Sequence, residues 1–370
     1  MGRTLSIGII GLPNVGKSTL FNALLKKSIA NTSNYPFCTI KPNVGIVKVP
    51  DKRLPILAEV IQTKRIVPAV IEFYDIAGLV KGASKGEGLG NKFLLHIGEV
   101  STIAHVVRLF EDKSISHVSK IINPAEDIKT IETELILADL AVLEKIKEAN
   151  KNNATKQEVF AFNTISIIKE KLNKEIPVRK IELTNEQKES IKQFNLLTLK
   201  PVVYIFNLSE KQLESVEQTK KNIKDILKQV GEEKAPYIYL SALLENEIFV
   251  FENNEQKEYL KQYSLKETGL NRFIKKAYDM LELISFFTAV PTAKLEAKAW
   301  TIKKGSSAYK AAGIVHTDFQ KKFIKADVIS FPEFIKYNGW LSSREKGKVQ
   351  TVGKNYVIKD SDVIEFKVQA

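Results

Sequence analysis

The chain has 370 residues, of which 44% are hydrophobic, and its formal net charge at pH 7 is +13. It contains no apolar run near the ~20 residues that a membrane-spanning helix needs, so we expect two or three soluble domains and no membrane partner. The single cysteine, Cys38, excludes an internal disulfide and favours the reducing cytoplasm. An inert Cys38 side chain is a better interpretation than a redox sensor.

A glycine-rich run follows the first apolar segment, Ser6 to Ile10, and precedes a helical pattern over 19–27. Glycines at both bends of this run let backbone N–H groups wrap around the β- and γ-phosphates of a nucleotide. Lys17 neutralises those oxygens, and the Ser18 hydroxyl is the natural ligand for Mg²⁺. The alternative is a simple glycine-rich turn. The predicted phosphate-binding residues are Asn14, Val15, Gly16, Lys17, Ser18 and Thr19.

Strand-like apolar runs alternate with helical stretches both before residue 125 and after residue 199. The runs are Ser6 to Ile10, Val70 to Tyr74, Ile103 to Leu109, Val202 to Phe206 and Tyr237 to Leu240. This alternation predicts an α/β fold, with a mainly parallel sheet covered by helices and ligands bound beyond the carboxyl ends of the strands.

A long polar helical region, 125–199, interrupts this pattern. Apolar residues recur there at spacings of three and four, which predicts two short coiled-coil seams. The polar turn 151–153 favours an inserted antiparallel helical hairpin. The seam residues are Ile128, Ile131, Leu135, Ala138 and Val142, then Ala161, Ile165, Ile168 and Leu172.

A third helix is predicted over 269–287, and short strand-like pieces follow it at 295–302, 328–329, 356–358 and 363–368. They predict a small α+β domain on a mixed sheet. The domains are then 1–124 with 200–285 for the nucleotide, 125–199 for the hairpin, and 286–370. The last part carries 15 Lys and Arg against 8 Asp and Glu. That surplus suggests RNA, although a Lys-rich soluble surface has the same composition.

Two further elements match nucleotide switches. Asp75-Ile76-Ala77-Gly78 follows a strand, where a carboxylate holds Mg²⁺ and the Gly78 N–H senses the γ-phosphate. Thr39 lies between the phosphate loop and this motif, where a hydroxyl completes the Mg²⁺ shell; a plain loop threonine is the alternative. Leu79 stands where related switches orient water with Gln, so unaided hydrolysis should be slow.

The position that selects the base is altered. Guanine-specific switches use Asn-Lys-x-Asp, in which Asp accepts from two guanine N–H groups. This chain has Asn207-Leu208-Ser209-Glu210. The guanine clamp is therefore lost, whereas the Asn207 amide and backbone groups near Leu208 can serve adenine. The loop that backs the base is predicted at Ser241, Ala242 and Leu243.

With these motifs in this order, the chain resembles the Obg-like ATPase family, also called YchF, over nearly its full length. The segments Asn34 to Thr39 and Asp75 to Ala83 look like that family's switches, and Gly313 to Phe319 looks like its TGS domain. The resemblance implies a translation-factor-class P-loop protein that prefers ATP to GTP and associates with ribosomes. It also implies a hydrolysis-assisting histidine at His117, with His96 as a local competitor, and a K⁺ ligand at Asn14.

We therefore expect a cytoplasmic ATPase switch, monomeric and dependent on Mg²⁺, that contacts the large or small ribosomal subunit, rRNA or tRNA and regulates translation or a stress response. Two alternatives stay open. One is a guanine switch of the Obg type, which titration with both nucleotides would distinguish. The other is a nucleotide-sensing RNA or protein scaffold whose turnover is incidental.

Overall fold

The computed structural model describes residues 6–29, 43–76, 89–112, 114–115, 122–146, 155–251, 253–289 and 295–369. Residue contacts divide the chain into two compact units. The first comprises the described parts of 1–27, 40–45 and 72–270, and the second those of 28–39, 46–71 and 271–370.

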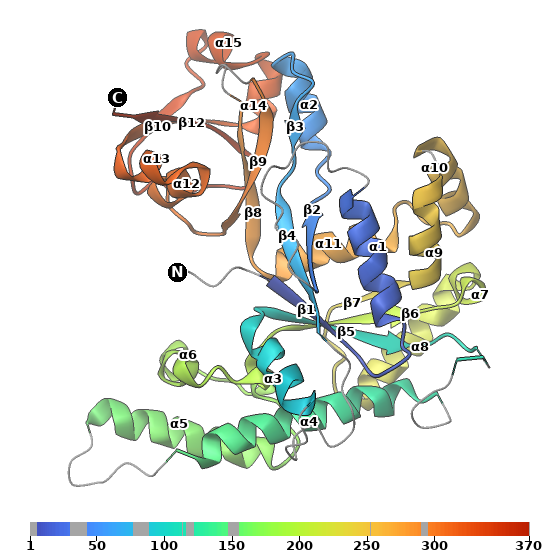
Figure 1. Ribbon diagram of the computed structural model, residues 1–370. Coiled ribbons are helices and arrows are strands. Elements are labelled where there is room, and N and C mark those ends of the chain that lie inside the picture. Colours follow the sequence, from blue (N-terminus) through green and yellow to red (C-terminus); the bar gives the residue numbers. More distant parts are fainter. Residues whose placement is uncertain are drawn as a thin grey trace. The chain divides into compact units, whose positions relative to one another are not determined.

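The first sheet has the order β2-β4-β1-β5-β6-β7 (Figure 1). The four pairings from β4 through β1, β5 and β6 to β7 are all parallel, which confirms the predicted mainly parallel sheet. β1 and β5 are buried along their whole length, as expected of central strands with helices on both faces. The strands are β1 (Ser6–Ile10), β2 (Val44–Lys48), β4 (Val70–Asp75), β5 (Thr102–Arg108), β6 (Val202–Asn207) and β7 (Tyr237–Leu240).

The helices of this unit follow the strands in chain order. Those that frame the cavity described below are α1 (Lys17–Ile29), α7 (Glu210–Glu214) and α9 (Ala242–Glu247). The others are α3 (Leu89–Glu99), α8 (Val216–Gln229) and α10 (Asn253–Gln262). Each of α1, α7 and α9 starts within a few residues of a strand's carboxyl end, so their N-termini gather at one edge of the sheet.

The helical insert is built on α4 (Pro124–Glu144) and α5 (Lys156–Leu172), followed by α6 (Asn185–Ile191). Three of the four residues of its second seam, Ile165, Ile168 and Leu172, are confirmed, because they are buried in one core cluster, whereas Ala161 is only partly buried and lies outside that cluster. The described residues that complete that cluster are Ile136, Leu143, Val178, Ile191 and Leu196.

The prediction of the first seam is wrong at its C-terminal end, at Val142. Val142 is 41% exposed, and the buried residues are Ile136, Asp139 and Leu143 instead. The reason is a buried carboxylate: Asp139 accepts hydrogen bonds from the backbone N–H groups of Leu197 (2.6 Å) and Thr198 (2.8 Å). The face of α4 is therefore set by packing on the segment 196–199 as well as on α5. The predicted turn 151–153 lies outside the described residues.

The predicted helix 269–287 is also wrong. Helix α11 (Gly269–Met280) ends early, Glu282 has a φ of 53°, and strand β8 (Leu283–Thr288) follows. A left-handed residue ends a helix, and a short apolar run such as Leu283 to Thr288 has no periodicity that separates strand from helix. The predicted domain boundary at 285/286 falls inside this strand.

The second sheet has the order β11-β10-β12-β8-β9-β3 and is mixed, as predicted. Its core contains Phe286, Ile302, Ala326 and Ile364. The predicted strand 356–358 forms only a single bridge, Ser307 to Val357. The remaining strands are β3 (Ile66–Val67), β9 (Ala297–Lys303), β10 (Phe323–Ser330), β11 (Gln350–Val352) and β12 (Asp362–Val368). The helices are α2 (Arg53–Val60), α12 (Ala308–Val315), α13 (Thr317–Lys321), α14 (Phe331–Lys336) and α15 (Trp340–Glu345).

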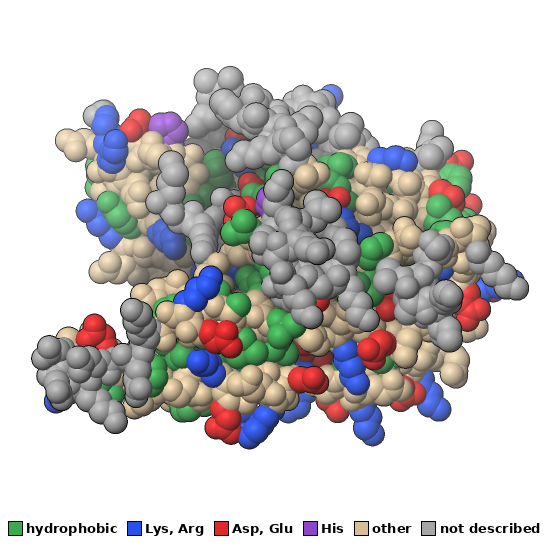
Figure 2. Space-filling view, turned by 60° about the horizontal axis from the view of Figure 1, so that its bottom comes forward, with side chains coloured by type: hydrophobic (Ala, Val, Ile, Leu, Met, Phe, Trp, Pro, Cys, Tyr) green, Lys and Arg blue, Asp and Glu red, His purple; other side chains and the backbone are tan. Residues whose placement is uncertain are grey.

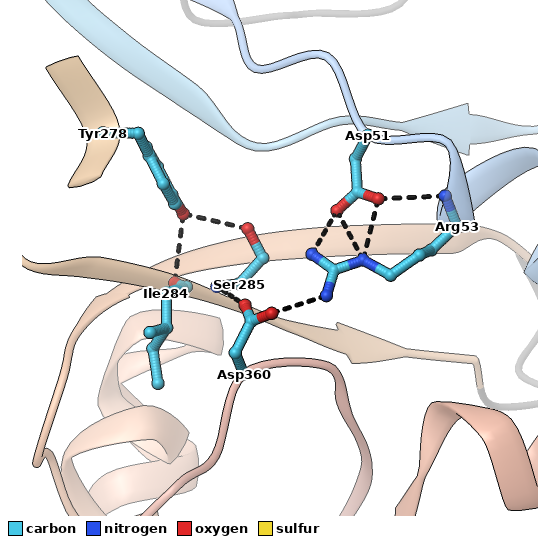
Figure 3. Close-up of polar contacts among 6 residues, drawn as sticks. All are labelled: Asp51, Arg53, Tyr278, Ile284, Ser285 and Asp360. Carbon is cyan, nitrogen blue, oxygen red and sulfur yellow. Dashed lines mark hydrogen bonds and ion pairs between the residues drawn. The ribbon is translucent and has the colours of Figure 1, made fainter. Parts of the chain in front are cut away.

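Charged and polar groups join α2 to the C-terminal sheet within the second unit (Figure 3). Arg53 bonds to Asp51 through Nη2 (2.7 Å) and to Asp360 through Nη1 (2.6 Å). Asp360 in turn accepts from the Ser285 backbone N–H at 3.0 Å, and the Ser285 hydroxyl lies 2.9 Å from the Tyr278 hydroxyl. The segment 46–71 is thus fastened to residues far along the chain.

Candidate functional site

The loop between β1 and α1 passes close to neighbouring groups and takes a backbone conformation that favours glycine. Asn14 and Gly16 have φ values of 63° and 89°, which place both residues in the left-handed region. A Cβ on Gly16 would lie 2.1 Å from Asn207 Nδ2, and one on Gly11 would lie 2.8 Å from the Val106 carbonyl oxygen. Both positions therefore need glycine. At Gly11 a side chain would collide with a neighbouring carbonyl, and at Gly16 it would collide with Asn207 and would also disfavour the left-handed backbone.

Lys17, at the start of α1, forms an ion pair with Asp75 at the end of β4. The two side chains are only 10% and 19% exposed, so this pair is weakly screened by solvent. Ser18 lines the same cavity as both of them. The structure thus brings together three of the predicted residues: the phosphate-binding lysine and two metal ligands.

Asn207, at the end of β6, ties two loops to each other. Its Nδ2 donates to the Val15 carbonyl oxygen (2.9 Å), and its Oδ1 accepts from the Ala242 N–H (2.9 Å). Its own carbonyl oxygen accepts from the Leu109 and Phe110 N–H groups. Asn207 therefore positions the phosphate loop, the loop before α9 and the segment after β5.

These residues surround one cavity of about 1510 Å³. Of the predicted site, the cavity is lined by Asn14, Gly16, Lys17, Ser18, Thr19, Asp75, Asn207, Leu208, Ser241, Ala242 and Leu243. Val15 is buried beneath the loop and contributes its carbonyl oxygen to Asn207. Thr39, Gly78, Leu79 and His117 lie outside the described residues. The competitor histidine, His96, is exposed on α3 and lies 3.6 Å from Glu99.

At the altered base motif, Leu208 is 2% exposed and its N–H donates to the Leu240 carbonyl oxygen at 2.8 Å. The Glu210 carboxylate accepts a hydrogen bond from the Tyr263 hydroxyl at 3.1 Å. Burial, helped by this carboxylate, raises the pKa of Tyr263 above its usual range, so Tyr263 stays a donor. The carboxylate at this position is therefore already engaged within the protein.

The sequence reasoning missed Phe110, which is one of several further residues that line the cavity, and Arg108, which lies behind it. Phe110 lines the cavity together with Leu208 and Leu243. Arg108 is 1% exposed and lies behind Phe110, with its guanidinium carbon 4.4 Å from the ring centroid. The available signal was an arginine at the end of an otherwise apolar central strand, where a charge requires an internal partner.

Comparison with known proteins gives matches along nearly the whole chain. One relative, the ribosome-binding ATPase YchF of Bacillus subtilis (strain 168), is 46% identical over 366 residues, 98% of this chain and 99% of the relative. The chain belongs to the YchF family. The YchF of Pasteurella multocida (strain Pm70), also named a ribosome-binding ATPase, is 45% identical over 97% of this chain and 98% of its own.

Family models and solved structures give the same assignment of this YchF-family chain. A model described as 50S ribosome-binding GTPase matches residues 6–163, and a YchF C-terminal model described as a protein of unknown function (DUF933) matches 283–369. The Schizosaccharomyces pombe YchF GTPase structure superposes with a TM-score of 0.87 at 35% identity, covering 99% of this chain and 98% of that one. This likeness confirms the predicted fold class. In the described part of the chain, we find no helix long and apolar enough to span a membrane.

Proposed function

We propose that this protein is a molecular switch that binds and hydrolyses ATP, prefers ATP to GTP, and associates with ribosomes. The names of its bacterial relatives state both the ATPase activity and the ribosome binding. The name of the fission yeast relative states a GTPase, so the choice of base has to be argued from the cavity of this chain.

The observation that carries the adenine preference is the Glu210 carboxylate, because one of its two oxygens already accepts a hydrogen bond from Tyr263. A guanine clamp needs a free carboxylate for two N–H groups and a lysine stem over the ring. Here Glu210 is bonded to Tyr263, and the buried Leu208 replaces the lysine. The Asn207 amide donates to Val15 and accepts from Ala242, so its second N–H and the second lone pair of its oxygen are what it can offer to the base contact that the sequence predicts.

Titration of the purified protein with Mg·ATP and Mg·GTP tests this preference. We expect ATP to bind at least about tenfold more tightly, because an unmatched guanine leaves polar groups unpaired. A guanine preference of that size would overturn the proposal. The double variant Leu208→Lys, Glu210→Asp restores the clamp residues and should narrow the difference. Tyr263→Phe is the matched control, because it frees Glu210 without building a clamp.

The residues near the phosphates fit a divalent ion. Ser18 and Asp75 offer a hydroxyl and a carboxylate on one cavity wall, and oxygen donors of this kind suit Mg²⁺. When bound, the ion supplies positive charge to the phosphate oxygens. We propose Ser18, Asp75 and Thr39 as its ligands, and Asn14 as a ligand for K⁺.

We propose slow turnover, assisted by His117, because Leu79 cannot orient a water molecule. His117→Ala should lower the ATPase rate and leave ATP affinity unchanged, and a parental rate would refute the catalytic role. The same variant tests the scaffold alternative. If that alternative holds, cells that carry a His117→Ala protein unable to hydrolyse ATP should keep full function. The Obg-type guanine switch is decided by the titration above.

We propose a cytoplasmic monomer with a nucleotide-binding domain, an inserted helical hairpin and a C-terminal domain, whose ribosome contact, through rRNA, tRNA or protein, changes with the nucleotide. Figure 2 shows acidic and basic side chains interspersed among the described residues of the face that it presents. Ribosome co-sedimentation at increasing salt, with and without a non-hydrolysable ATP analogue, tests the association. Binding through phosphates weakens steeply with salt. Co-sedimentation that ignores the nucleotide would refute the switch.

A further inference from the structure

Arg108, the last residue of β5, is buried and hydrogen-bonded to one short segment. Its Nε donates to the Phe110 carbonyl oxygen (3.2 Å), Nη1 to that of Ile115 (3.2 Å), and Nη2 to that of Asp112 (3.1 Å). A longer bond, 3.5 Å, joins Nη1 to the Asn14 carbonyl oxygen. Among the described residues, every hydrogen-bond acceptor of Arg108 is a main-chain carbonyl. Its donors therefore fix the path of a loop.

This loop forms part of the cavity wall. Phe110, Asp112 and Ile115 line the cavity together with Leu208, and the Arg108 guanidinium stacks behind the Phe110 ring. A planar cation at this distance stabilises an aromatic ring and restricts its position.

The loop is also attached to the altered base motif. The Phe110 N–H donates to the Asn207 carbonyl oxygen (3.2 Å), and Gln212 Nε2 donates to the Leu109 carbonyl oxygen (3.0 Å). The wall that Arg108 organises therefore adjoins the segment 207–212. Its bond to the phosphate loop, through Asn14, is the longest of the set.

We propose that Arg108 is a positioning residue for nucleotide affinity, which acts by holding Phe110, Asp112 and Ile115 in the wall beside the base. This inference rests on the proposed nucleotide binding. It predicts that loss of Arg108 weakens the interaction with the base and ribose of the nucleotide and spares the grip on the triphosphate tail.

Calorimetric titration of the full chain with Mg·ATP and with magnesium tripolyphosphate, which lacks a base, separates these two parts of the ligand. For Arg108→Met and Arg108→Lys we expect ATP to bind about tenfold more weakly, and tripolyphosphate to bind within about twofold of the parent. Lysine keeps the charge but lacks the planar fork that reaches several carbonyls. If Arg108→Met does not fold by circular dichroism, Arg108→Lys decides the result.

Equal weakening of both ligands would overturn the inference, because Arg108 would then act through the phosphate loop. Unchanged binding of both would overturn it as well. Adding Phe110→Leu to Arg108→Lys supplies a second criterion: the two losses in ATP affinity should be less than additive, and full additivity would refute action through Phe110. A parent protein that binds neither ligand would instead refute the proposed function.

Discussion

Arg108 beside the cavity is buried, and the side chain of Arg179 at the base of the helical insert is only 12% exposed, but their partners differ. Arg108 is satisfied by the carbonyl groups of a loop. Arg179 binds two carboxylates, Glu132 of α4 (2.9 Å through Nη1) and Glu232 after α8 (2.6 Å through Nη2). Burial opposes the charge of Arg179, yet both glutamates outweigh it and raise its pKa. Arg108 thus fixes the backbone beside a cavity, whereas Arg179 links the insert helix α4 to the segment after α8.

The largest effect is expected from Arg179→Met, which should lower the free energy of unfolding by about 3 to 5 kcal/mol, because Glu132 would keep a poorly solvated charge without its partner. ATP affinity should stay within about twofold, since the residue lies outside the cavity lining. Denaturant unfolding and titration measure the two quantities. Arg179→Lys is the control that retains the charge and should lose less. If Arg179→Met kept its stability but bound ATP poorly, Arg179 would act at the cavity and the two arginines would not differ in role.

At the cavity, Lys17→Ala should reduce ATP affinity on the order of 100-fold, because it removes a charge-assisted contact to the phosphates. The unfolding temperature should fall as well, because Asp75, only 19% exposed, would keep its charge without its partner, so the titration is run at a temperature at which the variant is folded. Lys26→Ala, on the exposed side of the same helix, is the matched control and should bind ATP like the parent. Comparable affinity for Lys17→Ala and Lys26→Ala would contradict the assignment of the phosphate loop.

A buried histidine of the central sheet, His105, should make the stability of the protein depend on pH. Burial, together with the positive charge of Arg179, lowers the pKa of His105 to about 3, whereas the unfolded chain titrates near its ordinary value. Between these values the unfolded state binds the extra proton, so stability is lost as pH falls from about 6.5 towards 3.

His105→Phe should remove this loss while it keeps an aromatic ring beside Tyr204. Between pH 6.5 and 4.5, we expect the parent to lose about 2 kcal/mol more than the variant. Unfolding curves across this range give the difference. The same substitution at exposed His96 should leave the pH dependence of the parent intact. Parallel pH profiles for the parent and His105→Phe would show that His105 does not titrate with folding.

The sequence predicted what local patterns encode, and failed where distant contacts decide. The phosphate loop, β1 and the buried face of α5 follow from residue order and periodicity. The exposed Val142 could not be foreseen, because the buried Asp139 turns that part of α4 toward Leu197 and Thr198. The roles of Arg108 and Asn207 depend on groups up to 192 positions away in the chain. Short strands such as β3 carry too few residues for any period.

The smallest effect is expected at the surface of the same insert. Lys192 lies 2.9 Å from Glu189, but both side chains are 72% exposed, so water and salt screen the pair. Lys192→Ala should change the free energy of unfolding by about 0.5 kcal/mol or less. If Lys192→Ala and Arg179→Met lowered stability equally, burial would not be what gives the Arg179 pair its strength. If the two variants lost different amounts of stability at low salt and similar amounts at molar salt, screening by salt would explain the difference.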